Sequence, residues 1–320
     1  MKLLGPGQPH ALDIAANDLA VLTAVTQPRR QHGIAAGPAA SFTNDLYARL
    51  LSDIDQDAPV VAMGALASGT DVARAEQITE EIYRGLGRSV DDYAAWISAG
   101  AMVAGIDAAR AIAITNEVFQ NVHWRIDSEA HLIALGAIVT GTSGIEAAKL
   151  ANAIHGALRE DMTETAPVVA VAAMLGKLDA KAAVSQLHDL YSEMRGNIRP
   201  AAHIVALGAF PTHAEASQAA KLANGIYDAM DMGIDVYAPV VAMGALMAGG
   251  VDAKVGAQLA NTAHDQLRAS VDEHAAWVAV AAMRGGVSAT AASVLTNDLY
   301  RELHASLDEH APVVALGALS

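Results

Sequence analysis

The chain has 320 residues, of which 53% are hydrophobic and only 4% aromatic, so its apolar content is mostly aliphatic and small. It carries 20 Lys and Arg residues against 35 Asp and Glu residues, a formal charge of −15. Nucleic acids need a basic footprint and anionic membranes attract basic segments, so this balance argues against both as partners. The absence of cysteine excludes disulfides, thiol catalysis and cysteine-based zinc sites.

Residues 1–17 contain no apolar run of signal-peptide length, and no stretch of 18 apolar residues occurs anywhere in the chain. We therefore expect a cytoplasmic protein. Residues 1–57 form a divergent first copy of the repeat described next, in which the basic loop 27–33 replaces a short turn. Terminal repeats often cap a stack, so capping is the favoured interpretation and a docking loop is the alternative.

A repeat of 36 residues organises the rest of the chain. The phrase Ala-Pro-Val-Val-Ala begins at Ala58, Ala166, Ala238 and Ala311, and the first two intervals, 108 and 72 residues, are three and two times 36. The last interval is one residue longer because Gly249-Gly250 extends one turn. One domain of seven regular repeats over 58–310 is predicted, with starts near 58, 94, 130, 166, 202, 238 and 275, followed by a half repeat over 311–320.

Each copy opens with a short apolar segment of about 11 residues, predicted as a first helix. Its sequence is apolar on every side, so something must cover it: a tightly curved stack, a second copy of the chain, or a ligand or partner. One inner position is glycine in six copies, which indicates that another backbone crosses close by. Trp96 and Trp277 share one position of this helix and are interpreted as core or as a pocket wall.

A second, amphipathic helix of about 18 residues follows a capping residue at a fixed offset. The capping residues are Asp71, Asp107, Ser143, Asp179, Glu215, Asp252 and Ser288. Glu215 is a poor cap, but Thr212 three residues earlier completes a capping-box pattern with it. No strand pattern accompanies these helices, so an all-α solenoid of about eight helical hairpins is predicted, possibly tightly curved or toroidal.

An asparagine ladder runs along the second helices. Asparagine is a poor helix former, so its recurrence requires a reason: hydrogen bonding between repeats, or capture of an extended peptide. Aromatic or histidine residues follow three positions later, on the same side of the helix. The candidate ligand- or partner-binding residues are Asn116, Asn152, Asn224, Asn261, Asn297, Tyr191, Tyr227, His155, His188, Trp96 and Trp277.

Other chemistry is weakly supported. An aspartate ladder at the turns, which includes Asp91 and Asp127, is interpreted as turn capping. The single pair Asp91-Asp92 lacks the second acidic motif of a diphosphate–magnesium site, and the two Asp-Glu-His runs, 272–274 and 308–310, lie one repeat apart. We therefore predict no catalytic residue, no metal site and no cofactor.

The hairpin stacking resembles that of tetratricopeptide, HEAT and armadillo proteins over nearly the whole chain. The 36-residue unit lacks the tetratricopeptide signature, and the resemblance carries no functional motif, although armadillo proteins use an asparagine ladder to hold peptides.

The function favoured by the sequence is that of a non-enzymatic binding or scaffold protein, which presents a curved, apolar inner surface to a protein segment or an apolar ligand. The first alternative is a small-molecule carrier or an α/α-toroid-like enzyme with a hydrophobic central cavity, whose polar groups would include His188, His155 or Glu80. The second is a self-assembling homo-oligomer, such as a homodimer, in which exposed first helices pair.

Overall fold

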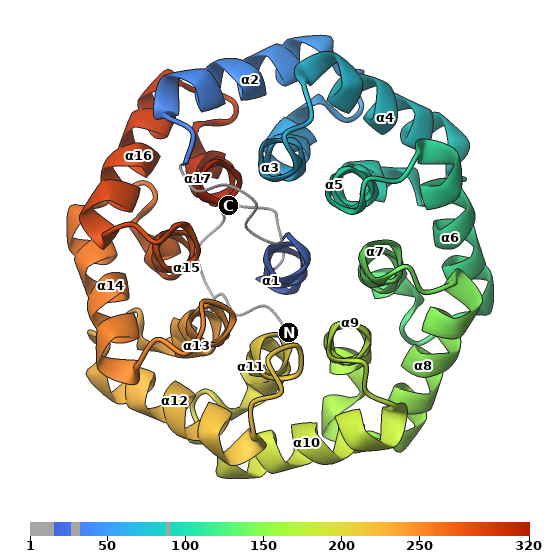
Figure 1. Ribbon diagram of the computed structural model, residues 1–320, viewed down its shortest axis with the longest axis vertical. Helices are drawn as coiled ribbons and strands as arrows, with labels where there is room; N and C mark the ends of the chain where they lie inside the picture. Colours follow the sequence, from blue (N-terminus) through green and yellow to red (C-terminus); the bar gives the residue numbers. More distant parts are fainter. Residues whose placement is uncertain (1–15, 27–32, 88–89) are drawn as a thin grey trace.

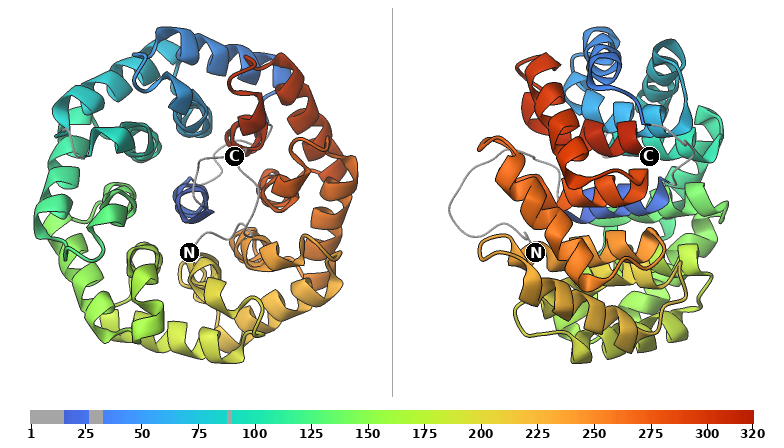
Figure 2. Two further views of the ribbon diagram at one scale, coloured as in Figure 1. Left: turned by 180° about the vertical axis from the view of Figure 1, so that it is seen from behind. Right: turned by 60° about the vertical axis from the view of Figure 1, so that its left-hand side comes forward.

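The computed structural model describes residues 16–26, 33–87 and 90–320. Within these ranges the chain forms seventeen α-helices and no strand, which confirms the predicted all-α helical repeat. The helices form two concentric layers in a closed ring, with one further helix in the middle (Figures 1 and 2). The toroidal form of the prediction, rather than an open stack, is the one that the chain adopts.

The outer layer consists of eight helices of 14 residues each. They are α2 (Ala36–Arg49), α4 (Val72–Gly85), α6 (Ala108–Asn121), α8 (Gly144–Ala157), α10 (Ala180–Glu193), α12 (Ala216–Ala229), α14 (Ala253–Gln266) and α16 (Ala289–Glu302). Each is shorter than the expected 18 residues because the next residue, such as Leu86, adopts an extended conformation and turns its apolar side chain into the core.

Side-chain caps begin most outer helices, as the sequence predicts. The Asp71 carboxylate accepts from the Arg74 N–H at 2.9 Å, and the equivalent bond recurs at five other caps. The predicted capping box at Glu215 is wrong. Glu215 makes no side-chain cap bond, and the Thr212 hydroxyl instead donates to the Gly208 carbonyl of the preceding helix at 2.7 Å.

The inner layer consists of eight apolar helices that run parallel to one another. They are α3 (Ala58–Ser68), α5 (Ala94–Ala104), α7 (Ala130–Thr140), α9 (Ala166–Gly176), α11 (Ala202–Ala209), α13 (Ala238–Met247), α15 (Ala275–Gly285) and α17 (Ala311–Leu319). Nearly every residue of these helices is buried. Their starts coincide with the repeat starts read from the sequence.

Short 3-10 turns lead from each outer helix into the next inner one, and the aspartate ladder begins six of them. They are η1 (Asp55–Asp57), η2 (Asp91–Tyr93), η3 (Asp127–Glu129), η4 (Glu160–Thr165), η5 (Arg199–Ala201), η6 (Asp235–Tyr237), η7 (Asp272–His274) and η8 (Asp308–His310).

The ring closes because the C-terminal half repeat takes the place of a missing inner helix. The first apolar segment, α1 (Ala16–Val25), does not lie in the inner layer, and α17 fills that position beside α3 and α2. The outer helix α2 packs against α16 on one side and α4 on the other (Figure 1). The divergent copy 1–57 therefore does not cap an open end, since the ring has none. The basic loop 27–33 lies outside the described residues except for Gly33.

Glycine lets neighbouring inner helices approach at backbone distance, as predicted. A Cβ added at Gly64 would lie 2.5 Å from the Ala99 Cα, and one added at Gly317 would lie 2.6 Å from the Met63 Cα. The second of these contacts joins α17, the last inner helix, to α3, the first. The seam between α17 and α3 is therefore packed like the contact between two consecutive repeats.

Among the described residues, no single helix has the length and apolar character needed to cross a membrane. By length and composition alone, one pair of helical segments qualifies together, Asp272–Gly285 with Ala289–Glu302, and the two are bent by 118° relative to each other.

Replacement of Gly64 by alanine tests the close approach of the inner helices. Alanine normally stabilises a helix by up to about 1 kcal/mol relative to glycine. At Gly64 the added methyl group would overlap the α5 backbone, so we expect Gly64→Ala to lower the free energy of unfolding by about 1–3 kcal/mol. Gly156→Ala on α8, where nothing lies within 4 Å of the added Cβ, should stabilise instead. Urea unfolding measures both, and equal effects would contradict the packing.

Candidate functional site: the ring interior and its two mouths

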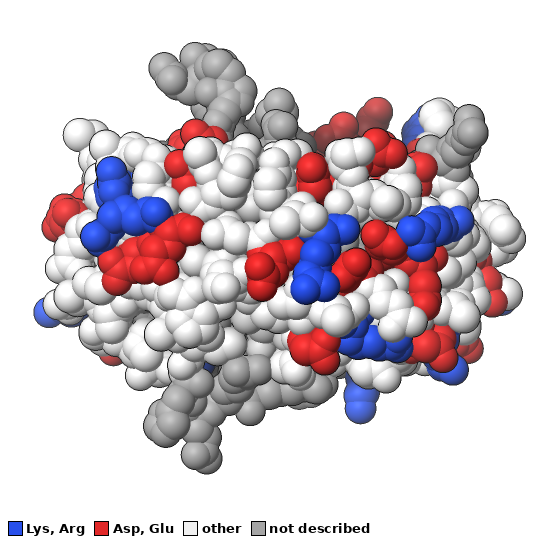
Figure 3. All heavy atoms as spheres, turned by 90° about the horizontal axis from the view of Figure 1, so that it is seen from above, with Lys and Arg blue, Asp and Glu red and all other residues white. Residues whose placement is uncertain are grey.

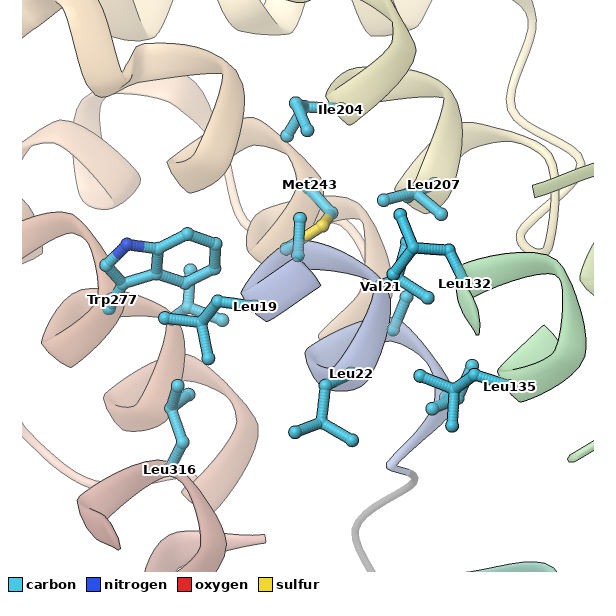
Figure 4. Packing of buried hydrophobic residues seen from close by; sticks show 14 of the residues in the cluster. Leu19, Val21, Leu22, Leu132, Leu135, Ile204, Leu207, Met243, Trp277 and Leu316 are labelled. Carbon is cyan, nitrogen blue, oxygen red and sulfur yellow. The ribbon is translucent and has the colours of Figure 1, made fainter. Parts of the chain in front are cut away.

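The ring interior is filled by α1. Leu19, Val21 and Leu22 of this helix are buried, and they lie among side chains from several inner helices (Figure 4). The labelled neighbours in that view are Leu132, Leu135, Ile204, Leu207, Met243, Trp277 and Leu316. Burial of a leucine or valine side chain contributes roughly 1.5–3 kcal/mol. A segment of the same chain therefore covers part of the inward face of the inner layer, most closely along α5, α7, α9 and α11.

Two histidines hold the first turn of α1. His131 Nε2 lies 3.1 Å from Asp18 Oδ1, and His203 Nε2 lies 3.0 Å from Asn17 Oδ1. Each histidine is the second residue of its inner helix, and both are buried. We call this end of the ring, where the inner helices begin, the amino mouth.

Other titratable groups surround the amino mouth, because the residue that precedes an inner helix is titratable in six of the eight repeats. Burial raises the pKa of Asp57 to about 6, with the charges of Asp92 and Asp55 acting in the same direction. Burial, followed by the charge of Asp18, raises the pKa of Glu129. Burial also lowers the pKa of His274 to about 4. Tyr93 stacks on His131 with ring centroids 3.9 Å apart and thereby fixes that imidazole.

An arginine marks the opposite end, the carboxyl mouth, where the inner helices end. Arg284 is the tenth residue of α15, is 8% exposed, and donates from Nη1 to the Thr23 carbonyl in the last turn of α1. A cavity of about 480 Å³ lies beside it. The residues that line the cavity are Ala24, Leu175, Pro211, Thr212, Met247, Ala248, Gly249, Met283 and Arg284.

The asparagine ladder lies in the outer layer, away from the ring interior. Asn152 donates from Nδ2 to the Asn121 carbonyl at 2.9 Å and accepts from the His123 N–H at 2.7 Å, which caps the end of the preceding outer helix. Asn224, Asn261 and Asn297 each make the same pair of bonds to the end of the outer helix that precedes their own. Asn116 occupies the same position on α6 and is half-buried. The side-chain amides of Asn152, Asn224, Asn261 and Asn297 thus connect consecutive repeats. A role of the ladder in peptide binding stays a prediction.

The same bonds cross the seam of the ring. Asn44 on α2 donates to the Glu302 carbonyl at 2.9 Å and accepts from the His304 N–H at 2.8 Å. Tyr47 stacks on His304 with centroids 4.7 Å apart. The outer helices α2 and α16 are therefore joined by the contacts that join consecutive repeats.

The other candidate residues divide between the two layers. Tyr191 donates to Asp161 at 3.4 Å, the Tyr227 hydroxyl accepts from Asn197 at 2.7 Å, and His155 stacks on His123 in the outer layer. His188 is half-buried on α10. Only Trp96 and Trp277 belong to the inner helices, where both are buried, and Trp277 lies beside Leu19 of α1 (Figure 4). The structure therefore does not bring the predicted residues together in one place.

Three residues that touch α1 were missed in the sequence. His131 and His203 stand where the other inner helices have proline or alanine at the second position, and Arg284 is the only charged residue at the tenth position. The detectable signal was this departure from the repeat. It could not be interpreted from the sequence, because nothing in the repeat indicates that a helix lies inside the ring.

The outer surface carries mixed charge. On the face in Figure 3, Lys and Arg side chains alternate with Asp and Glu rather than forming a continuous basic stripe. Ion pairs such as Arg195–Asp228 at 2.6 Å and Arg49–Glu76 at 3.3 Å join opposite charges in the outer layer. Such surface pairs contribute little to stability and favour solubility.

Substitution of Asn44 tests whether the ring is closed. Asn44→Ala would leave the Glu302 carbonyl and the His304 N–H without their partner, so we expect a loss of about 1–3 kcal/mol in the free energy of unfolding. Asn152→Ala should lose a similar amount within the ring. Asn121→Ala is the control, because the Asn121 amide donates only to Glu117 one turn back in its own helix. A neutral Asn44→Ala beside a destabilising Asn152→Ala would indicate an open seam.

The buried imidazole of His203 makes stability depend on pH. Burial lowers the pKa of His203 to about 4, whereas an unfolded histidine titrates near 6.5. Between these values the unfolded chain binds the proton and the folded chain does not, so stability falls as pH decreases from about 6.5 to about 4. We expect wild type to lose on the order of 2 kcal/mol more than His203→Gln between pH 7 and pH 4.5. Urea unfolding of both proteins at the two pH values measures this difference. Asp57 and His274 are present in both proteins, so their contributions to the pH dependence cancel. Parallel pH profiles would refute it.

In the described part of the chain, no group of three His, Asp or Glu side chains is arranged to hold a metal ion. The buried polar groups gather around the two ends of α1, and the ladder residues connect repeats. No protein-family model, no curated protein and no solved structure matches the chain. The ring and the helix inside it are therefore the features that bear on function.

Proposed function

We propose that the protein is a non-enzymatic binding scaffold whose ring interior receives a short apolar helix from a partner protein. The observation that carries this proposal is the seating of α1, a ten-residue apolar helix surrounded by the inner layer. In a common mode of peptide recognition, a helix places its apolar side chains in an apolar groove of the binding protein. In the resting protein the occupant is the chain's own segment.

The polar contacts of α1 support binding in one defined position rather than nonspecific apolar packing. His131 and His203 hold Asp18 and Asn17 at its start, and Arg284 holds the Thr23 carbonyl at its end. An apolar interior of uniform repeats would accept a helix in any register. Polar partners at both ends define one register and one direction, because a shifted helix would leave buried polar groups unpaired.

These contacts also define the partner segment. It carries an Asn or Asp pair in its first turn, followed by about two turns of leucine, valine and alanine. A partner helix must compete with α1, which is attached to the ring and present at a millimolar effective concentration. Binding would therefore follow release of α1. A cytoplasmic location and the absence of nucleic-acid or membrane partners remain part of this proposal.

The other candidate functions need more than this arrangement provides. A carrier or a toroid-like enzyme needs a central cavity, and α1 fills that volume among the described residues. A homo-oligomer built by pairing of first helices needs those helices exposed, and they are buried inside the ring. A central cavity, or pairing of the inner helices, would require α1 to leave the middle of the ring.

Binding of a synthetic α1 peptide tests the proposal. In the full-length variant Leu19→Asp/Leu22→Asp, two charges would make burial of α1 unfavourable, so the interior should become available. We expect this variant to bind a labelled peptide of residues 16–26 at least tenfold more tightly than wild type does, as measured by fluorescence anisotropy. A peptide with alanine at Asn17 and Asp18 should bind more weakly.

The matched control is Val294→Asp, which places a charge on an exposed position of α16 and should behave as wild type. A Leu19→Asp/Leu22→Asp variant that keeps its helical circular dichroism and cooperative unfolding, yet binds no peptide, would contradict the proposal.

A further inference from the structure

The carboxyl mouth contains a buried positive charge whose hydrogen-bonding capacity is mostly unused. Arg284 has five N–H donors in a planar fork, and Nη1 donates to the Thr23 carbonyl. Within the described residues, Nε and Nη2 are buried and have no hydrogen-bond partner. A buried guanidinium is unfavourable unless acceptors satisfy it.

The position of Arg284 explains part of this arrangement. The inner helices and α1 end at this mouth, so the negative ends of their dipoles favour a cation there. That effect does not satisfy the two remaining nitrogens. None of the residues that line the adjoining cavity carries a carboxylate, so the protein supplies no counter-ion from the cavity wall.

The two free nitrogens form one edge of the guanidinium, and that edge fits a carboxylate. Parallel N–H bonds from such an edge to the two oxygens of a carboxylate are the strong bidentate geometry of arginine. Arg159 of this chain uses the same edge on its surface, with Nε 3.1 Å from Asp161 Oδ1 and Nη2 2.6 Å from Oδ2. At Arg284 the edge has no acceptor, and because both nitrogens are closed to solvent, a carboxylate reaches it from the cavity only when the side chains around it move apart.

The remaining cavity wall is apolar. Leu175, Pro211 and Met247 are the tenth residues of three consecutive inner repeats, and Met283 and Ala24 extend this surface. Its volume of about 480 Å³ lies within the range of small-molecule sites, roughly 300–1,000 Å³. A flexible aliphatic chain suits a wall built largely from methionine and leucine.

We propose that the carboxyl mouth is a binding site for an aliphatic carboxylate, held by the Nε–Nη2 edge of Arg284 with its hydrocarbon chain along Leu175, Met247 and Met283. This site lies at the opposite end of the ring from the amino mouth and does not require α1 to leave. It therefore stands apart from the proposed uptake of a partner helix.

Calorimetric titration of the full-length protein with decanoate tests this site. Wild type should bind decanoate with one site per chain and should bind the uncharged decanol at least tenfold more weakly. Arg284→Met, which keeps an apolar side chain of similar length, should lose at least tenfold in decanoate affinity and little in decanol affinity. Arg74→Met, a change at an arginine on the surface of α4, should bind as wild type does.

A second variant controls for loosening of α1, because Arg284→Met also removes the hydrogen bond to the Thr23 carbonyl. Ala248→Phe fills the cavity and leaves the Arg284–Thr23 bond in place, so it should abolish decanoate binding in a folded ring. The proposal is overturned if wild type does not bind decanoate, if decanol binds as tightly as decanoate, or if folded Arg284→Met and Ala248→Phe proteins both keep wild-type affinity. None of these results depends on whether the α1 peptide binds in the other experiment.

Discussion

Burial of the inward faces of the inner helices is the constraint on which the rest of the molecule depends. A helix that is apolar on all sides must be covered on all sides, and a two-layer solenoid covers only the outward and lateral faces. An open stack of these repeats would expose an apolar strip along its concave surface. The chain removes that exposure by closing the ring and placing α1 in the centre, so closure and the central helix solve the same problem.

Small residues in the inner helices determine how tightly the ring curves. Glycine at Gly64 and Gly317 allows inner helices to approach at backbone distance, which tightens the inner circle relative to the outer one. The longer outer helices are linked by the asparagine bonds, whose spacing sets the outer circle. The difference between the two circles produces curvature, and eight hairpins close it. The seam requires no special device, because Asn44 repeats the bond made elsewhere in the ring.

Closure also explains the arrangement of the chain ends. Counting repeats gives eight outer helices but nine apolar segments of the inner type, if α1 is included. One of the nine must leave the ring. The C-terminal segment stays because Gly317 and its neighbours follow the repeat, whereas the α1 sequence does not. The displaced segment then occupies the space that the ring encloses, and His131, His203 and Arg284 match it.

Much of the fold followed from the sequence, because local rules decide it. The helix starts, the capping aspartates and serines and the glycine positions were predictable from the repeat alone. Closure was only one of several possibilities, since curvature depends on small differences between helix spacings that no single residue encodes. Thr212 misled the capping prediction because the Gly208 carbonyl of its own repeat was the nearer partner.

The candidate site was less predictable than the fold. The ladder asparagines were recognisable by recurrence, but recurrence marks what every repeat needs, and here they connect repeats. The residues around α1 are the ones that do not recur. His131 and His203 replace proline or alanine at one position, and their role becomes apparent only when Asp18 and Asn17 lie opposite them.

Amide hydrogen exchange across Ala16–Val25 in the intact wild-type chain tests whether α1 occupies the interior of the ring. A ten-residue helix has little stability in water on its own, so protection of these amides must come from their place inside the ring. We expect these amides to exchange about a hundredfold or more slower than the amides of a free peptide of the same sequence. Exchange at the rate of the free peptide, while α7 and α11 stay protected, would show that α1 does not occupy the interior and would contradict the account.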